Sequence, residues 1–255
     1  YPIRWISLPY HKKPPVLSSA YDYWQLKRCI RRIHREKKVD IVHTRPGLPA
    51  LAGLWMKKKL GVRFLNDIRG FWADERVDGG MWHMGFFLYR WIYRFFKKQE
   101  LDAVRLADYN TCLTHQAKEE IRSWTQVPQP VKLAVIPCSA DMSLFDPARI
   151  SDAQTQALKK ELGIAPDERV ISYLGSIGGW YLTEEMMRFH QLLLQENPRT
   201  KLLFISNNRH ETIAAAAQRQ GIPADKLLVR FAQHNDIPAL LKLSDYAIFF
   251  IKPCY

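Results

Sequence analysis

The sequence of 255 residues is long enough for two domains with separate cores, and its 47% hydrophobic and 25% charged residues are typical of a globular chain. It holds no apolar run of about 18 residues, which a membrane-spanning helix needs, and no signal-peptide pattern. The net charge of +13 is uneven. Residues 1–150 hold 26 Lys and Arg against 14 Asp and Glu, a balance of +12, whereas residues 151–255 hold 12 against 11. The basic first part predicts an anionic partner, which is a membrane surface, a nucleic acid or a phosphorylated substrate.

A first domain is expected over residues 1–147, where strand-like and helix-like segments alternate after a proline-rich opening. Its expected segments are a basic helix at 22–38, a strand at 40–43, a helix from Pro46-Gly47 to Leu60 with Gly61 as cap, a strand at 62–65, a polar loop at 66–80, an aromatic helix at about 82–106, a strand at 107–113, a helix capped by Thr114, and a strand at 131–136.

The pattern restarts after Pro147, so a second domain is expected over residues 148–255. Its expected segments are a helix at 152–162 ended by Gly163, a strand at 170–174, a glycine loop at 175–179, a helix at 183–196, a strand at 201–205, a helix at 211–219, a strand at 227–231, a helix at 237–243, and a strand at 246–251. Strands joined to helices by short connections predict parallel sheets with right-handed crossovers. The fold class is therefore α/β, with two tandem, doubly wound, Rossmann-like domains and with ligands at the carboxyl ends of the strands, in the cleft between the domains.

The ends of the sequence and its cysteines set further bounds. The chain opens on Tyr1 rather than Met and stops at Tyr255 just after a strand-like run, so we expect a fragment cut at both ends. The four cysteines form no CxxC pair and no metal-ligand spacing, which indicates a reducing compartment and no disulfides. DxD, HExxH, GxSxG and Cys/His motifs are lacking, so the sequence gives no support to a metal site or to acyl-enzyme chemistry.

One candidate site is the glycine-rich segment Leu174-Gly175-Ser176-Ile177-Gly178-Gly179, between an expected strand and an expected helix. Glycines let backbone N–H groups approach a phosphate closely, and the helix N-terminus adds a partial positive charge. The segment is neither GxGxxG nor a P-loop, and a plain strand-to-helix turn also uses glycine. Both interpretations therefore stay open at this point.

Two further candidates follow expected strands of the first domain. His43 and Arg45 suit an anionic ligand or a proton transfer, although a lone histidine there is as often structural. Residues 66–80 gather carboxylates, guanidiniums and glycines around Phe71 and Trp72, which favours a functional loop over a solvated one. Its charged members are Asp67, Arg69, Asp74, Glu75, Arg76 and Asp78.

The expected helix at about 82–106 is aromatic on all sides, and rings on all sides cannot face one small core. Aromatic and basic residues together fit the headgroup region of an anionic membrane. The alternative is a core helix with a solvated basic rim. The cations expected to contact a membrane are Arg90, Arg94, Lys97 and Lys98.

The order of these parts resembles glycosyltransferases of the GT-B fold, in particular the family 4-like group. The resemblance covers essentially the whole chain, and its motifs specify the fold better than the sugar. It rests on HTRPGLPALAGL at 43–54, residues 67–82, the strand–helix join at 107–121, VIPCSADMSLFDP at 135–147, the loop and helix at 173–187, and the strand at 244–253.

The resemblance implies an N-terminal acceptor domain, a C-terminal domain for a nucleotide-sugar donor, transfer with retention, and no metal or cofactor. Either Asp67 or His43 is expected to orient or deprotonate the acceptor hydroxyl. Gly175, Ser176, Gly178 and Gly179 are the residues implied to hold the donor phosphates. Those implied to face the sugar and acceptor are His43, Arg45, Asp67 and Arg69, with Asp74, Glu75 and Arg76 on the acceptor side.

The sequence departs from the family pattern after the glycine loop, where an Arg and a Lys are usual. Trp180, Tyr181 and Thr183 stand there instead. We expect Arg209 or Lys252 to stabilise the departing phosphates, with Arg69 and Arg76 as the alternative. The family's paired-glutamate donor segment would follow the last residue, so the fragment is expected to be inactive by itself.

The sequence thus predicts a hexosyltransferase at the cytoplasmic face of a membrane, acting on a glycan or lipid-linked acceptor in envelope or polysaccharide biosynthesis. One alternative is a nucleotide-sugar epimerase of the same architecture. Another is a basic nucleic-acid-binding module, which fits the charge of the first part but leaves the glycine loop and the second domain unexplained. Nucleic acid is therefore not an expected partner.

Overall fold

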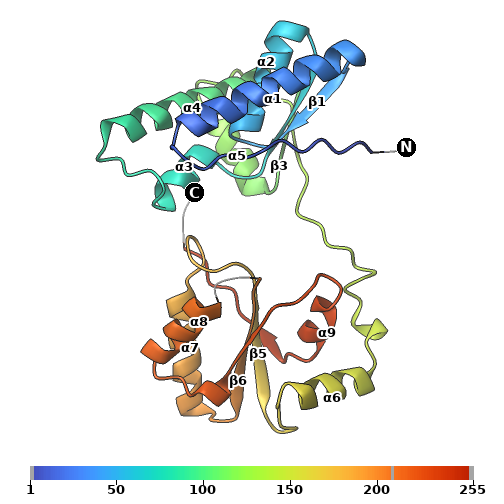
Figure 1. Cartoon of the computed structure of the whole chain (residues 1–255), viewed down its shortest axis with the longest axis vertical. Coiled ribbons are helices and arrows are strands. Elements are labelled where there is room, and N and C mark those ends of the chain that lie inside the picture. Colours follow the sequence, from blue (N-terminus) through green and yellow to red (C-terminus); the bar gives the residue numbers. More distant parts are fainter. Residues whose placement is uncertain (1–2, 208–209, 253–255) are drawn as a thin grey trace. The chain divides into compact units, whose positions relative to one another are not determined.

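The computed structural model describes residues 3–207 and 210–252 of the chain (Figure 1). Its contacts divide the chain into two compact units, which we call unit 1, up to Cys138, and unit 2, from Ser139 onward. The division falls in a connection, residues 136–146, that contains neither helix nor strand. The boundary expected after Pro147 lies at the other end of this connection.

Unit 1 alternates helices and strands as the sequence predicts. Its elements are α1 (Leu17–Glu36), β1 (Ile41–Thr44), α2 (Leu48–Leu60), β2 (Arg63–Ile68), α3 (Trp72–Asp78), α4 (Phe87–Leu106), β3 (Tyr109–Cys112), α5 (His115–Ser123) and β4 (Leu133–Val135). The predicted caps are confirmed, because Gly61 has the left-handed φ of 67° at the end of α2 and the Thr114 hydroxyl accepts a hydrogen bond from the N–H of Ala117.

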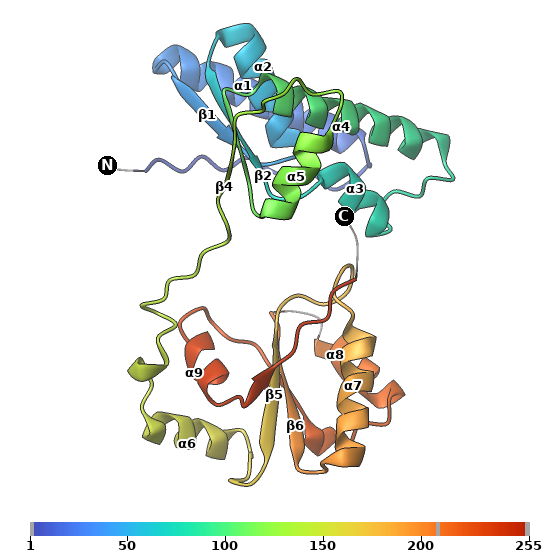
Figure 2. The ribbon, with the colours of Figure 1, turned by 180° about the vertical axis from the view of Figure 1, so that it is seen from behind.

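The sheet of unit 1 is parallel, with the strand order β1-β2-β3-β4 (Figures 1 and 2). Since each strand lies beside its predecessor, right-handed crossovers place α2, α4 and α5 on one face. Leu54, Phe64 and Ala103 form one buried cluster there. The opposite face carries exposed side chains, among them Ile41 at 58% and Tyr109 at 45%. Unit 1 therefore has its core on one side of its sheet.

The predicted loop at 66–80 is wrong in two places. Strand β2 continues to Ile68 because Asn66 and Ile68 extend the buried alternation that Phe64 begins. Residues Trp72–Asp78 then form the short helix α3, which side-chain partners on α4 hold in place. The helix expected from 82 begins only at Phe87, because the N–H groups of Met81 and Trp82 both turn back to the carbonyl of Arg76.

Unit 2 matches its predicted segments closely. Its elements are η1 (Pro147–Arg149), α6 (Asp152–Glu161), β5 (Arg169–Leu174), α7 (Thr183–Glu196), β6 (Thr200–Ile205), α8 (His210–Arg219), η2 (Ala224–Lys226), β7 (Leu227–Arg230), α9 (Ile237–Lys242) and β8 (Tyr246–Ala247). The strands are parallel in the order β7-β6-β5-β8.

Both faces of the unit 2 sheet are covered. Leu202 and Phe204 of β6 point into a cluster with α7 and α8, and the alternating Leu203 and Ile205 point into a second cluster with α6 and α9. The last predicted strand is too long. Strand β8 ends at Ala247, and after Ile248, whose N–H still donates to the carbonyl of Ser172, the chain runs beside residues 181–182, where the N–H of Leu182 donates to the carbonyl of Phe250.

Candidate active site

The polar residues of unit 1 meet at the carboxyl edge of its sheet. His43 on β1, Asp67 on β2 and Thr111 on β3 share one face, and Asp67 lies directly opposite Thr111 in the register. One Asp67 carboxylate oxygen accepts a hydrogen bond from Thr111 Oγ1 at 2.9 Å. The other accepts from Arg69 Nε at 2.8 Å and lies 3.5 Å from His43 Nε2. Three of the four groups were predicted from the sequence as site residues.

This network fixes Asp67 in its charged form. Burial by itself raises the pKa of Asp67, but the hydrogen bonds from Arg69 and Thr111 and the nearby positive charge hold it below its usual value. The same hydrogen bond raises the pKa of Arg69. Asp67 is 6% exposed, whereas the His43 side chain is 57% exposed. The carboxylate therefore anchors the cluster, and the His43 imidazole and the Arg69 guanidinium, whose side chain is 42% exposed, are its accessible members.

Thr111 is the residue that sequence reasoning missed. A threonine within a short strand is ordinary, and only the pairing of β2 with β3 sets its hydroxyl opposite Asp67. The available signal was the order of the strands, since polar residues near the ends of neighbouring parallel strands meet at one edge.

Arg45 is exposed at the connection between β1 and α2, and no ion pair or hydrogen bond joins its side chain to the described residues. The connection turns at Gly47, whose φ is 82°. A Cβ on Gly47 would lie 2.8 Å from the Trp72 indole, so the α2 start and α3 pack closely.

Of the three predicted acceptor-side residues on α3, Asp74 ties that helix to α4 and Arg76 makes a contact within it. Asp74 accepts hydrogen bonds from Tyr93 Oη at 2.8 Å and Lys97 Nζ at 2.6 Å, both on α4. Burial, together with Asp74, raises the pKa of Tyr93 to about 12. The Arg76 guanidinium lies 4.8 Å from the centroid of the Trp72 ring. These contacts explain why so polar a segment is helical.

Glu75 differs from both neighbours. Its carboxylate lies against Gly70, where an added Cβ would come within 1.8 Å of Glu75 Oε1. No hydrogen bond to its side chain is found within residues 3–207 and 210–252, and burial raises its pKa. Glu75 is therefore a half-buried carboxylate that the fold leaves without a donor.

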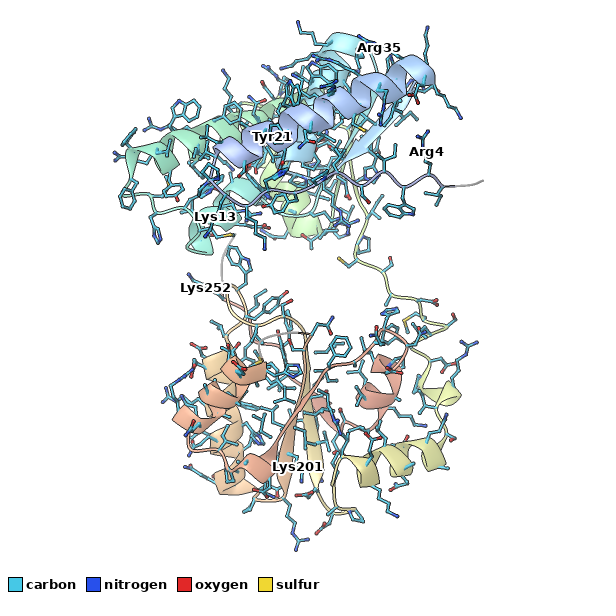
Figure 3. All side chains as sticks on the ribbon, viewed as in Figure 1. Arg4, Lys13, Tyr21, Arg35, Lys201 and Lys252 are labelled. Carbon is cyan, nitrogen blue, oxygen red and sulfur yellow. The ribbon has the colours of Figure 1, made fainter. Side chains whose placement is uncertain are left out.

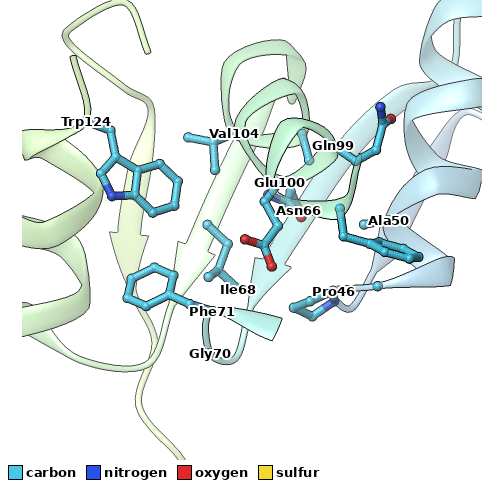
Figure 4. A pocket seen from close by; sticks show the side chains of 13 residues that line it. Pro46, Ala50, Asn66, Ile68, Gly70, Phe71, Gln99, Glu100, Val104 and Trp124 are labelled. Carbon is cyan, nitrogen blue, oxygen red and sulfur yellow. The ribbon is translucent and has the colours of Figure 1, made fainter. Parts of the chain in front are cut away.

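Beside this edge lies a small cavity that opens to solvent (Figure 4). It is lined mainly by apolar side chains, including Ile68, Phe71 and Trp124, and Glu100 points into it. Glu100 Oε1 accepts a hydrogen bond from the N–H of Ala73 at 2.9 Å, and burial raises the Glu100 pKa. Sequence periodicity gave no sign of this cavity, because its wall comes from four separate segments of the chain.

The four predicted membrane cations fall into two groups. Arg90, Arg94 and Lys98 are exposed on α4. Lys97 instead lies between Asp74 at 2.6 Å and Glu100 at 3.3 Å, with 26% of its side chain exposed. Aromatic side chains are also exposed at the start of α4 and along it, as expected. They are Phe86, Phe87, Trp91 and Phe95, exposed at 64%, 78%, 63% and 39%.

In unit 2 the glycine loop follows β5 and precedes α7. Gly178 and Gly179 have φ of 75° and 63°, which side-chain-bearing residues rarely adopt. A Cβ on Gly175 would meet Tyr173 Oη at 2.6 Å, and that hydroxyl donates to the carbonyl of Ser176 at 2.6 Å. The buried Tyr173 side chain therefore packs against the loop and stabilises its conformation.

The start of α7 suits an anion. In the part of the chain that the structure describes, no side chain caps its first N–H groups and no hydrogen-bond partner is found for the buried Thr183 hydroxyl. The backbone N–H of Lys252 donates to the carbonyl of Trp180 at 2.7 Å, which brings Lys252 beside the loop. Arg209, the other predicted phosphate ligand, lies outside the described residues.

Ser206 at the end of β6 is a second polar residue that the sequence did not reveal. It is 3% exposed, no hydrogen-bond partner for its hydroxyl is found among the described residues, and its carbonyl lies 2.8 Å from His210 Nε2. The described residues hold no group of three His, Cys, Asp or Glu side chains that could bind a metal ion. Nor is any helix among them both long enough and apolar enough to cross a membrane.

Two tandem Rossmann-like units with polar carboxyl edges define the GT-B class of glycosyltransferase fold. The sequence matches the profile of Glycosyltransferase Family 4 over residues 2–144, more than half of the chain, so the chain belongs to that family. No match was found among curated proteins.

Three solved structures illustrate the shared fold. Sucrose-phosphate synthase from Thermosynechococcus elongatus has 13% identity and a TM-score of 0.68, over 92% of this chain and 56% of that one. WaaG, a glycosyltransferase involved in lipopolysaccharide biosynthesis, has 14% and 0.67, over 98% and 62%. A putative UDP-N-acetylglucosamine 2-epimerase from Listeria monocytogenes has 13% and 0.56, over 94% and 59%. The chain thus spans less than two thirds of the length of each.

Proposed function

We propose that this chain forms part of an enzyme that transfers a hexose from a nucleotide-sugar donor to a glycan or lipid-linked acceptor in envelope or polysaccharide biosynthesis. The observation that carries the proposal is that each unit gathers its polar groups at the carboxyl ends of its parallel strands. Ligands bind at that edge in open α/β sheets. Membership of Glycosyltransferase Family 4 supports the same reaction class.

On the donor side, the N–H groups of Ser176, Gly178 and Gly179 bind the diphosphate at the start of α7. The N–H of Gly175, which the sequence also implied as a phosphate ligand, instead donates to the carbonyl of Ile205 on β6. Lys252 supplies a positive charge as the nucleoside diphosphate departs, and Arg209 is a second source of that charge. The sugar is transferred with retention, and neither a metal nor a cofactor takes part.

On the acceptor side, the geometry favours different roles for Asp67 and His43. Asp67 is held charged by two hydrogen bonds and is poorly accessible, so it positions His43 and Arg69. The exposed His43 imidazole faces the acceptor hydroxyl and orients it. Glu75 and Arg45 contact the acceptor, because the fold does not use their charges.

We further propose that the protein works at the cytoplasmic face of a membrane, with α4 against the lipid surface. Exposed rings and the cations Arg90, Arg94 and Lys98 alternate on this helix. Such a mixture is typical of the headgroup region of an anionic bilayer. Lys97 takes no part in this contact, since its ammonium group is bound by two carboxylates.

The proposal is tested by incubating the longest natural polypeptide that contains this chain with a panel of nucleotide sugars and membrane-derived acceptors. We expect release of one nucleoside diphosphate that depends on acceptor. His43→Ala and Asp67→Asn should each lower that release at least about tenfold, while Lys160→Gln, a surface change in unit 2, should not. No turnover with any donor would exclude the transferase.

A nucleotide-sugar epimerase is the second candidate, because an epimerase is among the structures that share the fold. It would convert its donor without any acceptor. Product analysis of each nucleotide sugar incubated with enzyme alone therefore separates the two reactions.

A further inference from the structure

Helix α1 carries a second basic and aromatic surface, which neither the fold nor the proposed site uses. The side chains that form it, here called the α1 stripe, are Leu17, Tyr21, Trp24, Arg28, Arg32 and Arg35. They recur every three or four residues, so they share one side of the helix. All six are exposed, Leu17 at 69%, Tyr21 at 50% and Trp24 at 51%. Figure 3 marks Tyr21 and Arg35 toward the two ends of α1.

The charge of this helix is not neutralised by its surroundings. Its two acidic residues are already engaged, since Asp22 accepts hydrogen bonds from the backbone and ring of His11 and Glu36 lies 3.9 Å from Arg32. No carboxylate among residues 3–207 and 210–252 pairs with Arg28 or Arg35. Exposed Lys37 and Lys38 follow the helix and extend the positive end. The stripe is therefore apolar and aromatic where it begins and cationic where it ends.

Ring contacts fix the aromatic part of the stripe. Tyr21 and Trp24 stack with centroids 5.9 Å apart, and the Arg28 guanidinium lies 5.6 Å from the Trp24 ring. On the inner side of α1, Lys27 and Arg31 lie 5.1 and 5.0 Å from Trp55 of α2. These cation–π contacts hold α1 on α2 while leaving the stripe outward.

We propose that the α1 stripe docks on an anionic lipid bilayer, as a membrane contact separate from the one on α4. Leu17, Tyr21 and Trp24 enter the interfacial region, where Tyr and Trp side chains are preferred. Arg28, Arg32 and Arg35 bind headgroup phosphates along the surface. A soluble polyanion would match the cationic half alone, and a neutral apolar partner would match only the other half. A bilayer with anionic headgroups matches both.

The test measures binding of the chain to vesicles, without donor or acceptor, so it does not depend on glycosyl transfer. Vesicles of phosphatidylcholine with about one third phosphatidylglycerol are compared with neutral vesicles by flotation. The triple variant R28Q/R32Q/R35Q should lower the partition coefficient on anionic vesicles roughly a hundredfold. Trp24→Ser should weaken binding even in high salt, where charge is screened.

Matched variants make the outcome specific. The variant R149Q/K160Q/R188Q removes three exposed cations from unit 2 and should change binding little, and circular dichroism checks that each variant stays folded. Unchanged binding of a folded R28Q/R32Q/R35Q protein would overturn the proposal. An equal loss of vesicle binding in the unit 2 variant would also overturn it, because net charge alone would then explain the binding. Retention on heparin with no vesicle binding would assign the stripe to a soluble polyanion instead.

Discussion

The two units use the same strand–helix alternation but differ in charge and in how their sheets are covered. Unit 1 holds 25 Lys and Arg against 12 Asp and Glu, whereas unit 2 holds 13 of each, so the whole excess of +13 belongs to unit 1. Unit 1 buries one sheet face and exposes side chains on the other, while unit 2 buries both. Unit 1 therefore has charged and exposed surfaces available for partners beside a one-sided core, whereas the sheet of unit 2 is enclosed between two apolar clusters.

The largest expected difference in the free energy of unfolding comes from the same Leu→Ala substitution on a covered and on an open sheet face. Leu203→Ala in β6 should destabilise unit 2 by about 2–5 kcal/mol, because the side chain is fully buried between strand and helices. Leu65→Ala in β2, on the open face, should cost under about 1 kcal/mol. Urea denaturation followed by hydrogen exchange in each unit measures both. Equal losses would remove the contrast between the sheets.

The next effect separates neighbours on α3. Asp74→Asn should destabilise unit 1 by about 1–3 kcal/mol, because it weakens the contacts to Tyr93 and Lys97 and leaves Lys97 short of a charge partner. Glu75→Gln should be neutral within about 0.5 kcal/mol, since no hydrogen bond is lost. Thermal denaturation of the two variants compares them directly. A larger loss for Glu75→Gln would contradict the roles assigned to these carboxylates.

Acid should affect unit 2 through His190. This residue is fully buried, and burial lowers its pKa. A depressed pKa means that stability is complete above the unfolded value of about 6.5 and falls as pH decreases below it, by at most about 1.4 kcal/mol per pH unit. His190→Gln should remove this dependence. Stability of unit 2 that is flat between pH 7 and 5 in the unsubstituted chain would refute the prediction.

Unit 1 should show a smaller effect of opposite sign through Glu100. Burial raises the pKa of this carboxyl, although Lys97 opposes the shift. A raised carboxyl pKa means that stability is greatest below the unfolded value of about 4.5 and is lost as pH rises through the folded value. Glu100→Gln should flatten this slope in a denaturation series from pH 4 to 7. If Glu100→Gln leaves the pH dependence of stability unchanged, that dependence arises from another titratable group and the prediction is wrong.

The fold was largely predictable because its signals are local. Alternating apolar strands, Gly61 and Thr114 as caps, and the glycine loop each depend on a few consecutive residues. The segments that were predicted wrongly depend on contacts with residues far away in the sequence. Helix α3 is held by Tyr93 and Lys97, twenty residues onward, and no periodicity within the helix itself indicates them.

The candidate site was predicted in part for the same reason. His43, Asp67 and Arg69 could be proposed as candidates from the sequence because they stand at or just after strand ends, where ligands bind in such sheets, and their roles stay predictions. Predicting Thr111 would have required the strand order. Predicting Ser206 would have required knowing that its hydroxyl has no hydrogen-bond partner among the described residues. Lys97 was predicted to contact a membrane, whereas its ammonium group pairs with Asp74 and Glu100. The sequence does not show whether a lysine on an aromatic helix faces solvent or a carboxylate of another helix.

The proposed transferase depends on unit 2 binding the nucleoside diphosphate of a sugar donor at its glycine loop. Hydrogen exchange of the chain, with and without UDP, GDP, ADP and dTDP, tests this most directly. We expect that one of these ligands protects residues 175–179 and the first turn of α7, and that Gly178→Val abolishes the protection. Protection by none of the four, or protection confined to unit 1, would contradict it.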